Sequence, residues 1–259
     1  MLTIESNTNN GLIILWDLVE GKRDASMKPY AGAVITACFD LSNAHVATLG
    51  CDMQGRHQII VWNIQSLLTE KNTVTNNSNA AIVARQISEF PTHKIRFSPF
   101  LDASLVSCGR ENIRFWRIRK GHLPGRPVLL NEYARGYVFN DIAFHGESLK
   151  STKDYEKPFV YVSSNKGLVL RINHQTDQIL CAFQLHSGNI RSFFIHSGYA
   201  VTGADDNRLR IWPLDFSDFL LEARHEGSIT NINVSNDGRK QVIGTVVGTL
   251  GILNVSEHR

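Results

Sequence analysis

Three residues in the last third of the chain carry side chains that together could perform acyl transfer: His186, Thr202 and Asp206. A hydroxyl nucleophile, an imidazole base and an orienting carboxylate form such a set in many hydrolases. Here the set is followed by Trp212 at the end of an apolar strand. This spacing and the tryptophan favour a structural role over catalysis, and we therefore predict that the chain has no catalytic residues and is not an enzyme.

Other chemistry-bearing motifs are absent from the sequence. It contains no GxGxxG loop after a strand, no P-loop, no HExxH motif and no GxSxG elbow. The ten histidines are scattered, and the four cysteines show no CxxC spacing. We therefore expect no metal and no cofactor, and free thiols in a reducing compartment.

All four tryptophans close short apolar strands. These strands end at Trp16, Trp62, Trp116 and Trp212, and two strands of the same shape reach Leu170 and Leu253. Neighbouring positions in this series are 41 to 54 residues apart. A period of roughly 40–45 residues that ends in a Trp-Asp-like pair is typical of the WD40 repeat. The sequence thus resembles the WD40 family, which implies an all-β propeller of four-stranded blades.

The repeat divides the chain into about five full blades and one partial blade. The predicted units are residues 1–18 (partial), 28–65, 85–119, 128–173, 178–214 and 219–255, with a low-complexity loop at 66–84. The first unit lacks its innermost strand, so we expect a piece of a larger, tandem propeller protein. A closed six-bladed ring with irregular ends is the alternative. Further insertions at 120–127 and 146–158 are predicted to be loops.

The WD40 resemblance gives the opening residues a role. It implies that Asp206 accepts a hydrogen bond from His186, that His186 meets the hydroxyl of Thr202, and that this hydroxyl meets the indole N–H of Trp212. Such a relay gives every buried polar group a partner. Three other units have a non-acidic residue at the aspartate position, namely Arg110, Ser164 and Val247. We expect those units to depend on packing instead.

Charge is distributed unevenly along the chain. The composition is ordinary for a globular protein, and no apolar stretch is long enough to span a membrane. The net charge is +3, but residues 85–135 contain ten Lys and Arg against four Asp and Glu. The candidate interaction surface is Arg114, Arg117, Arg119, Lys120 and Arg126. We expect these residues to face solvent and to attract an acidic partner, with a simply solvated face as the alternative and no nucleic-acid binding.

Three segments resemble more specific families. Residues 107–117 (SCGRENIRFWR) and 138–146 (VFNDIAFHG) resemble large centriolar and ciliary WD-repeat proteins. Residues 49–64 (LGCDMQGRHQIIVWNI) resemble the echinoderm microtubule-associated protein-like propellers. These resemblances imply a scaffold in the cytoplasmic cytoskeleton, at the centriole, basal body, cilium or flagellum. Its partners would be tubulin or microtubules, or centriolar and axonemal proteins. The alternative is a general WD40 adaptor in ubiquitin ligation or trafficking that binds peptides or proteins on the propeller top face.

Overall fold

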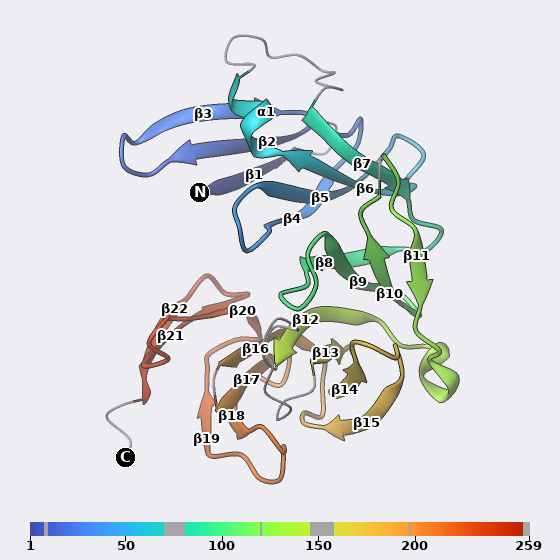
Figure 1. Cartoon of the computed structure of the whole chain (residues 1–259). Coiled ribbons are helices and arrows are strands. Elements are labelled where there is room, and N and C mark those ends of the chain that lie inside the picture. The colour runs from blue at the N-terminus through green and yellow to red at the C-terminus, as the bar shows by residue number, and fades with distance from the viewer. Residues whose placement is uncertain (8–9, 70–80, 120, 146–157, 197, 256–259) are drawn as a thin grey trace, which may run out of the picture. The chain divides into compact units, whose positions relative to one another are not determined.

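The computed structural model describes residues 1–7, 10–69, 81–119, 121–145, 158–196 and 198–255. It contains two compact units, Met1–Pro127 and Val128–Arg259, and each unit holds three antiparallel sheets (Figure 1). The other named elements are one short helix, α1 (Ile64–Thr69), and one 3-10 turn, η2 (Asn131–Ala134). The predicted loop at 66–84 therefore includes part of α1, while residues 70–80 lie outside the described part of the chain.

The first unit contains one three-stranded and two four-stranded sheets, each in simple chain order. Its first sheet comprises β1 (Leu2–Asn7), β2 (Asn10–Asp17) and β3 (Lys22–Met27). Its second comprises β4 (Val34–Phe39), β5 (His45–Cys51), β6 (His57–Asn63) and β7 (Ile82–Ile87). Its third comprises β8 (Thr92–Phe97), β9 (Ser104–Gly109), β10 (Asn112–Arg117) and β11 (Gly125–Pro127).

The second unit has two four-stranded sheets and one three-stranded sheet. The fourth sheet comprises β12 (Phe139–His145), β13 (Phe159–Ser164), β14 (Leu168–Asn173) and β15 (Ile179–Gln184). The fifth comprises β16 (Ile190–His196), β17 (Tyr199–Ala204), β18 (Arg208–Pro213) and β19 (Leu221–Arg224). The sixth comprises β20 (Ile229–Val234), β21 (Lys240–Thr245) and β22 (Leu250–Asn254).

The all-β fold class is confirmed, with a small difference in strand count. The described residues form four four-stranded sheets and two three-stranded sheets, where five full blades were expected. In the first sheet, β2 carries Trp16 and the edge strand β1 precedes it, and no further strand pairs with β1 among the described residues. In the sixth sheet the outer strand is the one not found in the described residues. The division of the chain into repeat units at the residues given above stays a prediction.

In the second to sixth sheets, the first strand contains a β-bulge, which gives a common point from which to compare register positions. The irregularities lie between Val34 and Thr36, Thr92 and Lys94, Phe139 and Asp141, Ile190 and Ser192, and Ile229 and Asn231. Counted from the bulge, the same register position holds Trp62, Trp116, Trp212 and Leu253. In the fourth sheet this position holds Ile172, which pairs with Val160. The assignment of Leu170 to that position was therefore wrong by two residues.

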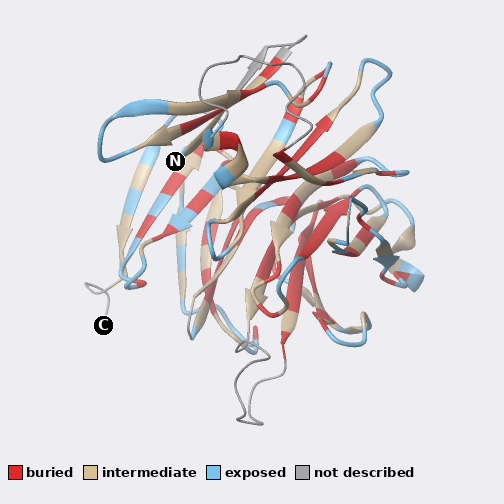
Figure 2. Cartoon of the chain, turned by 45° about the horizontal axis from the view of Figure 1, so that its top comes forward, coloured by how far each residue is buried: buried red, intermediate tan, exposed pale blue. Residues whose placement is uncertain are grey.

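The core lies between neighbouring sheets within each unit. The second strands are buried on both faces, and they are rich in small and β-branched residues, as in HVATLGC of β5 and YAVTGA of β17. A strand buried on both faces is expected to read as such a continuous apolar run. The strands at the outer ends, such as β15 and β19, contain only intermediate and exposed residues. Figure 2 shows the same gradient from buried inner strands to exposed turns.

Candidate functional site

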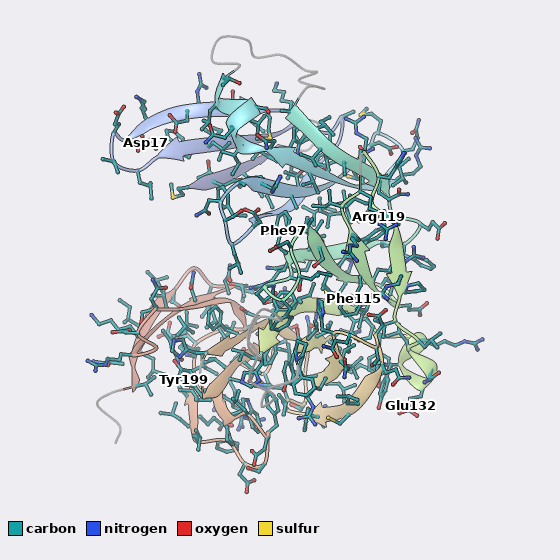
Figure 3. The ribbon with its side chains drawn as sticks, viewed as in Figure 1. Asp17, Phe97, Phe115, Arg119, Glu132 and Tyr199 are labelled. Carbon is teal, nitrogen blue, oxygen red and sulfur yellow. The ribbon has the colours of Figure 1, made fainter. Side chains whose placement is uncertain are left out.

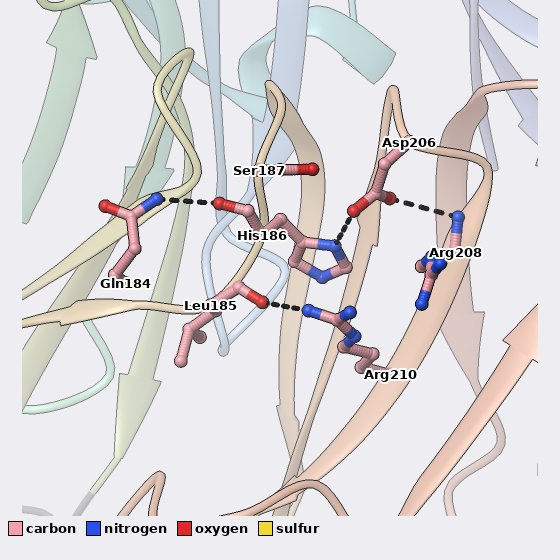
Figure 4. A pocket seen from close by; sticks show the side chains of 7 residues that line it. All are labelled: Gln184, Leu185, His186, Ser187, Asp206, Arg208 and Arg210. Atoms are coloured by element: carbon pink, nitrogen blue, oxygen red, sulfur yellow. Dashed lines mark hydrogen bonds and ion pairs between the residues drawn. The ribbon is translucent and has the colours of Figure 1, made fainter.

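The fifth sheet brings together the four residues that the sequence singled out. His186 lies in the loop between β15 and β16, Thr202 on β17, and Asp206 in the turn between β17 and β18. The His186 Nδ1 lies 2.9 Å from the Asp206 carboxylate, and its Nε2 lies 2.7 Å from the Thr202 hydroxyl. The Trp212 indole N–H donates to the same hydroxyl at 2.8 Å. Figure 4 shows the contact between His186 and Asp206, the outermost contact in this series of hydrogen bonds.

These hydrogen bonds run in one direction. The indole can only donate, so Thr202 accepts from Trp212 and donates its own proton to Nε2 of His186. Nδ1 of His186 then carries a proton and donates it to Asp206. Burial lowers the pKa of His186, an effect that the neighbouring Asp206 carboxylate opposes. The imidazole is therefore neutral at physiological pH, as this arrangement requires.

The arrangement cannot work as a nucleophilic triad. Thr202 is completely buried, and its hydroxyl is already occupied by Trp212 and His186. A substrate carbonyl cannot reach an atom that solvent cannot reach. What the geometry provides is a satisfied polar chain inside the sheet. Its role as a stabilising relay, rather than as part of a binding site, stays a prediction.

A cavity of about 560 Å³ opens beside the relay. Its walls are Gln184, Leu185, His186, Ser187, Asp206, Arg208 and Arg210 (Figure 4). Arg208 and Arg210 both bind the Glu222 carboxylate, at 2.6 and 2.7 Å, and these bonds lower the pKa of Glu222. The two guanidinium groups are offset by two carboxylates, Glu222 and the wall residue Asp206, so the cavity is polar without a net charge. It offers hydrogen-bond donors to a polar group, but the residues that the structure describes include no cluster of three metal-ligating side chains.

The same indole contact recurs in every sheet that has a tryptophan. The hydroxyl partners are Thr3 for Trp16, Thr48 for Trp62 and Ser107 for Trp116, at 2.7 to 3.0 Å. In the second sheet the Thr48 hydroxyl also meets the buried Tyr30 hydroxyl at 2.8 Å. Tyr30 thus stands where the fifth sheet has His186. Sequence reasoning missed it, although Tyr30-Ala31-Gly32 has the same spacing to glycine as His186-Ser187-Gly188.

Arg114, a member of the candidate interaction surface, does not lie open to solvent. Its side chain is 17% exposed and binds Glu89 at 3.1 Å. Its guanidinium carbon lies 5.2 Å from the centre of the Phe90 ring and 5.7 Å from that of Trp116. Such stacking is a favourable cation–π arrangement. Arg114 therefore packs against its own sheet and presents little free charge.

The other members of that surface lie around the β10–β11 connection. Arg117 and Arg119 are exposed, and Arg126 is exposed on β11. Figure 3 shows Arg119 beside this connection. Lys120 lies outside the described residues.

The β10–β11 connection is held against the second sheet. Gly121 forms a bridge with Ala84 of β7, and its carbonyl accepts the Arg85 amide at 3.3 Å. Arg85 is exposed and was not singled out from the sequence. Arg85 lies next to this surface because the β10–β11 connection contacts β7 at Gly121. The salt bridges recorded among the described residues include none to Arg85, Arg117 or Arg119.

Comparison with known proteins extends these observations. No protein-family model matches the sequence. The β-propeller domain of Cps50 (Swd1) from Myceliophteria thermophila superposes with a TM-score of 0.74 at 13% identity, covering 98% of this chain and 80% of that domain. WD repeat-containing protein 90 from Xenopus tropicalis is 29% identical over 94% of this chain. Centriole proteome protein 16 from Chlamydomonas reinhardtii is 33% identical over 95% of it.

The chain has the WD40 β-propeller fold and is similar to a segment of WD repeat-containing protein 90. The similarity extends to the mouse and human proteins of that name, at 27% and 28% identity. The chain spans 12% to 14% of the length of these curated relatives. The six sheets are therefore WD40 blades, and the bulged first strand of the second to sixth sheets is the innermost strand of each blade. No helix in the described part of the chain is long and apolar enough to cross a membrane.

Proposed function

We propose that this chain is a non-catalytic protein-interaction scaffold of the centriole or cilium that associates with microtubules. The observation that carries the proposal is similarity to Centriole proteome protein 16 along 95% of the chain. The fold supports a scaffold because it supplies rigid sheets with exposed loops, and its most triad-like residues are buried and already hydrogen-bonded.

The basic surface around the β10–β11 connection is the proposed contact with an acidic partner, of which the tubulin surface is the leading candidate. Its working members are Arg117, Arg119, Lys120 and Arg126, with Arg85 beside them. Arg85, Arg117 and Arg119 are exposed and have no salt bridge recorded among the described residues, so these three can supply charge to a partner. Contacts of this kind weaken with salt, because the Debye length is about 8 Å at physiological ionic strength.

The test combines location with co-pelleting. A tagged chain is expected to mark centrioles or cilia, and purified chain is expected to pellet with microtubules at low salt and less so at high salt. Arg117→Glu/Arg119→Glu/Lys120→Glu should abolish pelleting while leaving the circular dichroism spectrum unchanged. The matched control reverses three charges in the second unit, by Arg224→Glu/Arg239→Glu/Lys240→Glu, and should pellet like the parent.

Two outcomes would count against the proposal. Equal pelleting by the two charge-reversed variants would show that the basic surface is only solvated. A diffuse distribution in cells, with no pelleting by the parent at low salt, would favour a general WD40 adaptor that binds peptides or proteins in a ubiquitin ligase or trafficking complex.

A further inference from the structure

The connection between β18 and β19 exposes two large apolar side chains next to each other. Phe219 is 46% exposed and Leu220 is 67% exposed. The connection belongs to the second unit and can be followed from β18 to β19 in Figure 1. In the fourth sheet the corresponding β14–β15 connection exposes the polar residues Gln175 and Thr176 instead. The apolar pair is therefore not required by the blade itself.

The backbone around this pair is fixed from inside the unit. Phe216 is 6% exposed, and its ring centre lies 4.7 Å from that of Phe183 and 5.7 Å from that of Tyr161. Its φ of 56° is a left-handed conformation, which a bulky residue keeps only where the surrounding structure imposes it. The Leu220 amide donates to the Ile211 carbonyl at 2.7 Å. The connection is therefore held both before and within the exposed pair.

The exposed ring of Phe219 is also supported by its own sheet. Its centre lies 5.8 Å from that of the Trp212 ring, at an interplanar angle of 85°, and 5.2 Å from the guanidinium carbon of Arg210. Arg210 binds the Glu222 carboxylate at 2.7 Å and donates a further hydrogen bond to the Leu185 carbonyl. A side chain that is already held loses little conformational entropy when a partner covers it. Phe219 is therefore a pre-organised apolar anchor.

Two carboxylates beside the apolar pair carry negative charge that the unit does not balance. Asp215 and Asp218 are exposed, and neither has a salt bridge among the described residues. Asp215 accepts hydrogen bonds from the amide and hydroxyl of Ser217, at 3.1 and 3.0 Å. Residues 214–222 contain three acidic residues and no basic one. The connection therefore attracts basic groups, although the whole chain has a net charge of +3.

A second exposed apolar pair shows that composition alone does not make such a surface. Leu18 and Val19, in the turn after β2, are 68% and 95% exposed and lie between Asp17 and Glu20. Here Glu20 is paired with Lys22, and the Asp17 carboxylate accepts the amides of Val19 and Glu20. Part of the charge of this turn is thus neutralised, and its sequence supplies no aromatic anchor. The turn is a matched control for the pair in the fifth blade.

We propose that Asp215, Asp218, Phe219 and Leu220 form a docking surface for a basic amphipathic segment of a partner protein. Apolar side chains of the segment cover Phe219 and Leu220, and its Lys or Arg side chains pair with the two carboxylates. Interfaces are commonly built in this way, from an aromatic anchor at the centre and a polar rim around it. The docking surface belongs to the second unit and the proposed microtubule contact to the first, so this proposal does not depend on the proposed function.

The test measures the binding of a defined probe by fluorescence anisotropy. The probe is a labelled amphipathic peptide of leucine and lysine, and its counterpart is the same peptide with glutamate in place of every lysine. We expect the chain to bind the lysine peptide about ten-fold more tightly than the glutamate peptide, because only the lysine peptide complements the two carboxylates. Its affinity should fall with added salt, since exposed charges are screened.

Variants assign the binding to this surface. Phe219→Ser/Leu220→Ser should weaken binding of the lysine peptide by about ten-fold, as expected on loss of an anchor. Asp215→Asn/Asp218→Asn should weaken it as well and remove most of its salt dependence. Because all four residues are exposed, both variants should keep the circular dichroism spectrum and melting temperature of the parent. Leu18→Ser/Val19→Ser is the matched control and should bind the peptide like the parent.

Three outcomes would overturn the proposal. The first is failure of the parent chain to bind the lysine peptide, or equal binding of the lysine and glutamate peptides. The second is equal binding of the lysine peptide by the parent and by Phe219→Ser/Leu220→Ser. The third is a dimer of the parent chain in sedimentation velocity that Phe219→Ser/Leu220→Ser dissolves, because the occupant of the docking surface would then be a second copy of this chain.

Discussion

Thr202→Val tests whether the relay of the fifth blade stabilises the fold. Valine keeps the shape of threonine, so the change creates no cavity. It removes the hydroxyl that accepts the Trp212 indole at 2.8 Å and donates to His186 at 2.7 Å. Two buried polar groups lose their partner, and each such loss costs about 1–3 kcal/mol. We expect the free energy of unfolding to fall by roughly 2–5 kcal/mol.

The assay is urea unfolding followed by circular dichroism. With an m-value of about 3 kcal/mol/M, the expected loss moves the midpoint by roughly 1 M. Thr230→Val, at an exposed position of β20, is the matched control and should change stability by less than about 0.5 kcal/mol.

A double-mutant cycle with Trp212→Phe assigns the effect to the hydrogen bond. Phenylalanine has no N–H, so the orphaned donor disappears and Thr202→Val should cost about 1 kcal/mol less in that background. The structural interpretation would be refuted if Thr202→Val matched the exposed control in stability but abolished partner binding.

Three further predictions concern other buried residues, namely Asp141, Gly109 and His186. Asp141→Ala should cost about 2–3 kcal/mol in urea unfolding because an inner-strand amide of the next blade loses its charged acceptor, whereas Asp141→Asn should cost clearly less. Gly109→Ala should cost about 1–3 kcal/mol because a Cβ there would lie 2.0 Å from the Pro91 carbonyl oxygen, while Gly244→Ala, with 3.7 Å of clearance, should cost little; equal effects would contradict this. Burial lowers the pKa of His186 below its unfolded value of 6.5, so its stabilising contribution is present above pH 6.5 and is lost as pH falls through the folded-state pKa. His186→Gln should therefore show a shallower loss of stability between pH 7 and 5 than the parent.

The tryptophan spacing was sufficient to predict the fold, because a Trp-closed strand recurs at a fixed place in the blade. Of the two blades that lack the tryptophan, the sixth was aligned correctly at Leu253 and the fourth was not. In β14 the sequence LVLRIN is apolar at several positions, so either Leu170 or Ile172 could be aligned with the tryptophan. Counting from the bulge between Phe139 and Asp141 assigns Ile172 to the tryptophan position. A bulge cannot be located from the alternation of apolar and polar residues alone.

The candidate interaction surface shows a second limit of strand alternation. Both Arg114 and Arg117 were expected to face solvent, but they are three residues apart on β10 and therefore lie on opposite faces, and a face of a blade can be covered by neighbouring side chains. Arg114 points to a face where the rings of Phe90 and Trp116 cover it, whereas Arg117 stands at the exposed end of the strand. Long side chains can bury their stems against aromatic rings and keep the charged end paired, here with Glu89.

The sixth blade shows how the relay and packing are connected. It keeps a histidine, His225, at the place of His186, but Ile243, Leu253 and Val247 replace the hydroxyl, the indole and the carboxylate. His225 Nε2 is consequently buried without a hydrogen-bond partner in the described structure. A sheet without the relay must gain its stability from apolar contact, and the sixth sheet makes that contact through Ile229, Ile232 and Ile243, which pack against the fifth sheet.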